Sequence, residues 1–192
     1  MICLLDAHDL NSGLSRHLAN EDLNETIHVR TYALLSANIK DAFNEMRILS
    51  LGARTAKPGV HAILSPSIAY NLEQWDVAWL HFEQVVGLED QPFVEVKHLK
   101  FGRGGRNVEH SHRIYSRIDD QGKVIGLSHI AAKAEKVSRL CEVANGERLT
   151  SGRWNRAVIE NLESEGRNDI ANMMRAAGFW EKERPETTSR AE

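Results

Sequence analysis

The chain has 192 residues, of which 42% are hydrophobic and 27% charged, and this composition suits one domain with a sizeable core. No run of about 18 apolar residues is present, which excludes a membrane-spanning helix. Cys3 and Cys141 form neither a zinc-type spacing nor a disulfide framework, so a reduced cytoplasm is the simplest setting. The net charge of −3 argues against indiscriminate nucleic-acid binding.

Strands and helices alternate through the first half of the chain. β-prone runs favour strands, and apolar residues at spacings of three and four favour helices. The expected order is a strand at 2–5, a helix around 14–18, a strand at 26–32, a helix from about Ser36 to Leu49, a strand at 60–65 and a helix from about 71 to 86.

A hairpin and a helical end follow. Residues 93–98 and 107–118 read as two strands joined by a glycine-rich basic loop, and amphipathic helices are expected at 130–144, 153–164 and 169–177. This order predicts an α+β fold, an antiparallel sheet backed by helices, with a helical C-terminal part. We expect one domain over 1–180 and a polar, flexible tail over 181–192.

Three histidines in this hairpin form a candidate metal site. His110 and His112 are two apart in a strand, so both rings point to one face, about 7 Å apart along the chain. His98 ends the preceding strand, and a hairpin would bring it alongside. Three neutral imidazoles converging on one point can hold a metal with open positions. The alternative is three histidines with ordinary hydrogen bonds.

The same stretch is locally basic. Six Lys or Arg residues stand between Lys97 and Arg117 against one acid, Glu109. Such an excess suits a phosphate backbone, although a solvated basic hairpin would show the same composition.

Two families share features of this hairpin. Gly104, His110 and His112 match the start of a cupin metal motif, which would favour a metal enzyme for a small substrate. The glutamate expected next is replaced by Ser116 or Arg117, and no second cupin motif follows. The order His98, His110-Ser111-His112 and a polar strand end more closely resembles the relaxases, the mobilisation nucleases of plasmid conjugation among the HUH endonucleases. The segment 13–25 also resembles the opening of one relaxase branch.

The resemblance implies metal-dependent nicking and rejoining of single-stranded DNA at the transfer origin of a plasmid or mobile element. His98, His110 and His112 would hold Mg²⁺ or Mn²⁺, which would bind the scissile phosphate as a Lewis acid. Relaxosome proteins and secretion-system coupling proteins would be the partners. The residues expected to contact DNA are Arg103, Arg106, Arg113, Arg117 and Tyr115. Tyr115 would stack a base, and the alternative is that it packs in the sheet.

One departure concerns the nucleophile. Relaxases place a tyrosine on the first helix, but this chain has tyrosines only at 32, 70 and 115. His17 occupies that place, and a neutral imidazole can attack a phosphodiester. We therefore predict His17 as the catalytic residue. The alternative is a non-catalytic DNA-binding accessory protein of the relaxosome with the same fold.

Overall fold

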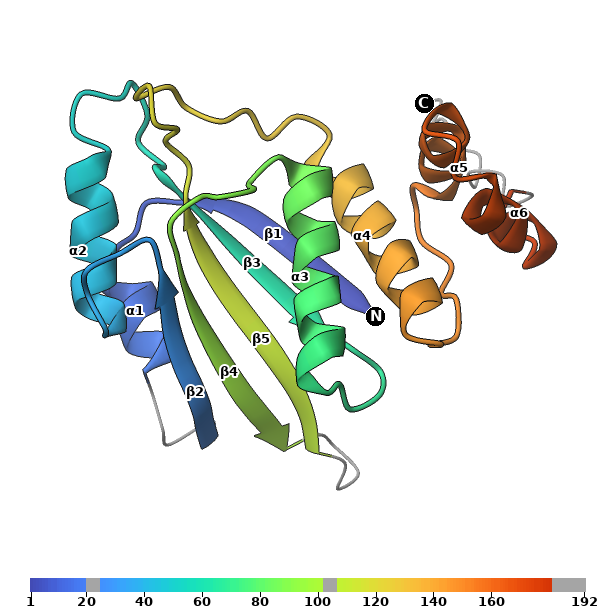
Figure 1. Cartoon of the computed structure of the whole chain (residues 1–192), viewed down its shortest axis with the longest axis horizontal. Helices are drawn as coiled ribbons and strands as arrows, with labels where there is room; N and C mark the ends of the chain where they lie inside the picture. Colours follow the sequence, from blue (N-terminus) through green and yellow to red (C-terminus); the bar gives the residue numbers. More distant parts are fainter. Residues whose placement is uncertain (20–24, 102–106, 181–192) are drawn as a thin grey trace, which may run out of the picture.

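A five-stranded antiparallel sheet forms the centre of the protein (Figure 1), seen in a computed structural model that describes residues 1–19, 25–101 and 107–180. The strands are β1 (Ile2–His8), β2 (Glu25–Tyr32), β3 (Gly59–Ser65), β4 (Phe93–Phe101) and β5 (Asn107–Ser116). Their order is β1-β3-β5-β4-β2, and every neighbouring pair is antiparallel. The predicted fold class is therefore confirmed, and the histidine-bearing β5 is the central strand.

Helices α1 (Ser12–Leu18) and α2 (Ile39–Leu49) cover one face of the sheet. Strand side chains alternate between faces, so Val94, Val96 and Ile114 point to the same side as His98, His110 and His112. These three apolar residues form a core with α1 and α2, chiefly through Leu18, Phe43 and Met46. We call this side of the sheet the histidine face.

Helices α3 (Leu72–Val86) and α4 (Ile130–Ala144) cover the opposite face. A capping box between Asn71 and Gln74 begins α3, and Gly87, with φ of 83°, ends it. Trp79, Phe82 and Tyr115 lie at the centre of this larger core. Most of the buried aromatic residues thus pack on the face opposite the histidines, and the shorter helices α1 and α2 cover the histidine face.

Two helices at the C-terminal end pack on α4 and lie apart from the sheet (Figure 1). They are α5 (Asn155–Ser164) and α6 (Asn168–Ala176), and their apolar faces enclose a third core with Leu140 of α4. The predicted tail at 181–192 lies outside the described residues, and a single domain over 1–180 stays a prediction. No helix within the described ranges has the length and apolar character needed to cross a membrane.

The predicted elements occur in the predicted order, with several shifted ends, and β4 continues past His98 to Phe101. β1 continues past Leu5 to His8, because Asp6 and His8 pair with His61 and Gly59 of β3. α2 begins at Ile39, not at Ser36, because the Asn38 side chain accepts a hydrogen bond from the N–H of Asp41. The longer β1 adds Asp6 and His8 to the histidine face.

Candidate functional site

The β4–β5 ladder brings the three predicted histidines together. His98 lies directly opposite His110, and Val96 lies opposite His112, so the three rings share one face. Their centroids are separated by 5.6 Å for His98 and His110, 5.1 Å for His98 and His112, and 4.9 Å for His110 and His112. The hairpin therefore gathers the three rings as expected.

Burial keeps two of these imidazoles neutral. His98 and His112 are 2% and 6% exposed. Desolvation, followed by the nearby His110 and His17, lowers the pKa of His98 to about 4. Desolvation, followed by the neighbouring His61 and His110, lowers the pKa of His112 to about 2. A neutral ring has a nitrogen lone pair to offer a cation, so these two rings can act as donors at ordinary pH.

The residues present fit a divalent cation. Rings that share a metal through bonds of about 2.0–2.1 Å have centroids about 4.5–5.5 Å apart, close to the separations seen here. The Nδ1 atom of His98 is buried without a hydrogen-bond partner, as a ligand atom would be. No set of three His, Cys, Asp or Glu side chains in the described ranges has its donor atoms arranged to hold an ion as it stands. Rotation of an imidazole about its Cβ–Cγ bond re-aims its nitrogens while the ring stays nearly in place, so the ring separations and the unpaired Nδ1 of His98 are compatible with a bound cation.

A fourth histidine, His61 of β3, joins the site. β3 neighbours β5, and Nε2 of His61 lies 2.9 Å from Nδ1 of His112. His61 is not among the residues predicted from the sequence. Its position in the strand at 60–65, between the apolar Val60 and Ala62, indicates that its side chain points to the face opposite theirs. The sequence does not reveal that β3 pairs with β5, which is what brings His61 to His112.

His17 lies on α1, where Asn11 caps the helix and Leu18 anchors it in the core. The side chain of His17 is exposed. His17 is among the smaller electrostatic causes of the lowered pKa values of His61, His98 and His112, so its ring lies within electrostatic range of all three. The predicted nucleophile thus stands near the predicted metal site, although its catalytic role stays a prediction.

The prediction that Arg113 and Tyr115 contact DNA is wrong. Both follow His112 at odd offsets, so they point to the opposite face, and they are 3% and 0% exposed. The Arg113 guanidinium bonds Glu83 and Glu95, and Tyr115 packs against Phe82. Their role is to hold the sheet against α3.

The other predicted DNA contacts lie away from the histidines or outside the described residues. Arg117 follows the end of β5, about 16 Å along the strand from His112, and its Nε donates to the carbonyl of Ile125. Arg103 and Arg106 lie outside the described residues.

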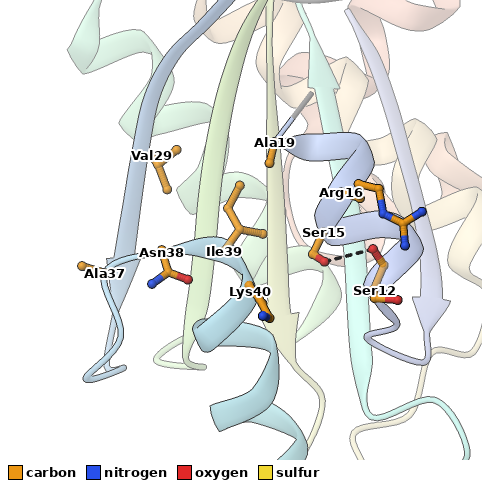
Figure 2. Close-up of a pocket in the computed structure, with 9 residues that line it drawn as sticks. All are labelled: Ser12, Ser15, Arg16, Ala19, Val29, Ala37, Asn38, Ile39 and Lys40. Carbon is orange, nitrogen blue, oxygen red and sulfur yellow. Dashed lines mark hydrogen bonds between the residues drawn. The ribbon is translucent and has the colours of Figure 1, made fainter. Parts of the chain in front are cut away.

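A cavity of about 560 Å³ opens beside α1 (Figure 2). It lies between α1, β2 and the start of α2, with an apolar lining that includes Ala19, Val29 and Ile39. Arg16 and Lys40, both exposed, stand at its edge and form no ion pair with any residue that the structure describes. This basic pair is not predictable from the sequence, because Arg16 and Lys40 are far apart in the chain and only the fold brings them to one cavity.

Comparison with known proteins assigns the family. Residues 17–147 match the family model described as relaxase, MobA/VirD2-like, nuclease domain. A search of curated proteins finds no match. The matched region spans the sheet strands β2 to β5, the histidine hairpin and His17, and it covers well over half of the chain. The chain therefore belongs to the relaxase family and contains its MobA/VirD2-like nuclease domain.

Proposed function

We propose that the protein nicks and rejoins single-stranded DNA at a transfer origin of a plasmid or mobile element. The observation that carries this proposal is the gathering of three hairpin histidines on the face of the sheet that is covered by α1, the helix of His17. Family membership supports the same reaction class. The corresponding setting is the cytoplasm, with relaxosome and secretion-system coupling proteins as partners.

His98, His110 and His112 would hold the divalent cation, Mg²⁺ or Mn²⁺. When bound, the cation supplies Lewis-acid polarisation of the scissile phosphate and offsets the charge that develops as the bond breaks. Imidazoles bring no negative charge of their own. A cation held by three of them therefore keeps its full charge for the phosphate.

His17 would act as the nucleophile. Its neutral imidazole nitrogen attacks phosphorus, the new N–P bond forms, and the P–O3′ bond breaks. The 3′ oxygen leaves with a proton, the imidazolium loses one, and a phosphoramidate joins His17 to the 5′ end. The reverse attack by the 3′ hydroxyl rejoins the strand and releases the imidazole.

The single-stranded DNA next to the scissile phosphate would lie over α1 and over the cavity beside that helix. Arg16 and Lys40 supply cationic groups for phosphates, and the apolar floor suits a sugar or base. On α1, Arg16 directly precedes His17, so one short helix would carry both a backbone contact and the nucleophile. These residues replace the buried Arg113 and Tyr115 as the proposed DNA contacts.

A second candidate function is that of a non-catalytic accessory protein that binds DNA in the relaxosome. The position of the tyrosines favours it. Tyr70 and Tyr115 are buried in the core under α3, and Tyr32 stacks on Phe93, which belongs to that same core. No tyrosine of this chain lies on the histidine face, so catalysis would require His17 as the nucleophile. If His17 does not attack DNA, a protein that only binds DNA remains.

A trapping experiment separates the two candidates. The wild-type protein is incubated with Mn²⁺ and a pool of labelled single-stranded oligonucleotides of random sequence, and covalent adducts are resolved under denaturing conditions. We expect an adduct that survives alkali and disappears in acid, is absent from His17→Ala, and is unchanged in the control Tyr32→Phe. Binding without any adduct in the wild type would favour the accessory protein, and an unchanged adduct in His17→Ala would remove His17 from the mechanism.

A further inference from the structure

His61 and His112 touch across neighbouring strands. In the β3–β5 ladder His61 pairs with Ile114, and His112 pairs with Ile63, so the two histidines are diagonal neighbours on the histidine face. Their rings lie nearly parallel, with centroids 5.2 Å apart and an interplanar angle of 19°. The closest polar atoms are His61 Nε2 and His112 Nδ1, 2.9 Å apart.

This contact restricts what His112 can offer a cation. A neutral imidazole carries one N–H and one lone pair. Nδ1 of His112 is engaged by His61, which leaves Nε2 as the atom available to a cation. Nε2 has a free lone pair only when Nδ1 carries the proton and donates it to His61.

We propose that His61 is a positioning residue that holds His112 in the tautomer protonated on Nδ1 and so directs Nε2 toward the cation. The proposal rests on the metal site included in the proposed function. In metal sites generally, a ligating histidine donates its other N–H to a carboxylate, a carbonyl or a water molecule. Here a second imidazole occupies that position.

Two neighbouring side chains, Glu95 and His8, are placed for other contacts. Glu95, the buried carboxylate closest in the ladder, lies on the opposite face and is bonded to Ser111, Arg113 and Arg30. His8 is on the histidine face, with its ring 6.3 Å from that of His61. Nδ1 of His8, however, accepts a hydrogen bond from the backbone N–H of Leu10, so the residues that follow β1 hold this ring.

The first test measures Mn²⁺ affinity by the loss of the free-ion EPR signal, with no DNA present. His61→Leu removes the acceptor, and we expect it to weaken binding about 10- to 100-fold. His61→Gln retains an acceptor oxygen, and we expect its affinity to stay within about threefold of the wild type. His8→Ala, which removes a histidine of the same face, serves as the control and should bind as the wild type does. Equal affinity in His61→Leu and the wild type would overturn the proposal.

The second test reads the tautomer directly. Nitrogen-15 NMR of the metal-free protein should show His112 protonated on Nδ1 in the wild type and in His61→Gln, but not in His61→Leu. Pulsed EPR of the Mn²⁺ complex should count three coordinated imidazoles; four would make His61 a ligand and refute the positioning role. A wild type that binds no Mn²⁺ would refute the metal site of the proposed function, while the tautomer measurement would still decide the role of His61.

Discussion

Arg113 lies directly opposite Glu95 in the β4–β5 ladder, and its Nε donates to Glu95 Oε2 at 2.9 Å on the face that turns away from the histidines. Glu95 is 0% exposed and also accepts hydrogen bonds from Ser111 and Arg30. Strands β4 and β5 therefore present the proposed cation site on one face and a buried ion-pair network on the other. Because β5 carries both, the network fixes the strand on which His110 and His112 stand.

Replacing Arg113 should destabilise the fold. Arg113→Leu leaves Glu83 and Glu95 without their shared buried partner, and breaking a buried ion pair in this way costs about 3–5 kcal/mol. Urea unfolding measures the loss. Arg156→Ala is the control: its ion pair with Glu160 is exposed on α5 and should contribute less than about 0.5 kcal/mol. A stable Arg113→Leu variant that had lost DNA binding would return Arg113 to the DNA interface.

DNA binding should depend instead on the basic pair at the cavity. Each cation that neutralises a phosphate of single-stranded DNA contributes about −0.7 to the slope of log K against log salt. The double variant Arg16→Gln, Lys40→Gln should therefore bind more weakly and have a slope shallower by about 1.4. Fluorescence anisotropy with a labelled oligonucleotide at several salt concentrations gives both values.

The matched control for this experiment removes the same charge elsewhere. Arg156 and Arg167 lie on and next to the C-terminal helices, away from the sheet, and the ion pairs that each forms are exposed. Arg156→Gln, Arg167→Gln should leave the slope unchanged. If the two double variants show the same affinity and the same salt slope, binding responds to net charge alone, and the DNA does not contact the cavity.

Local pattern explains why the hairpin histidines were predictable. His98 and His110 flank a short glycine-rich loop between two β-prone runs, so the chain itself dictates their pairing. No short-range sequence pattern predicts that His61 lies beside His112, because α3 and β4 separate β3 from β5 in the chain. Alternation along β5 puts Arg113 and Tyr115 on the face opposite the histidines. The basic composition of the hairpin does not reveal that Glu83 and Glu95, from other elements, neutralise Arg113 in the core.

Stability should fall as the pH drops from about 6.5 to about 4. His61 and His98 have folded-state pKa values of about 4, mainly because burial disfavours their charged forms, whereas the unfolded chain titrates near 6.5. Between these values the unfolded state binds more protons, so acid favours unfolding. Metal-free protein in EDTA, unfolded with urea at pH 7, 5.5 and 4.5, should show this decline. His61→Gln, His98→Gln should flatten it, and an unchanged slope would contradict burial as its cause.

The most specific prediction concerns the chemistry of the adduct. Restoring a tyrosine where the resemblance places one, with His17→Tyr, should convert an acid-labile phosphoramidate into an acid-stable phosphotyrosine without changing which DNA end is captured. The reason is positional: residue 17 lies on α1 within electrostatic range of His98 and His112, so either nucleophile would approach the same phosphate. Acid and alkali treatment of the trapped adducts, followed by peptide mass spectrometry, distinguishes the two bonds. His28→Tyr, an exposed histidine on the edge strand β2, is the control and should leave the adduct acid-labile and attached to His17. An acid-labile adduct that persists in His17→Tyr would show that another side chain attacks the DNA.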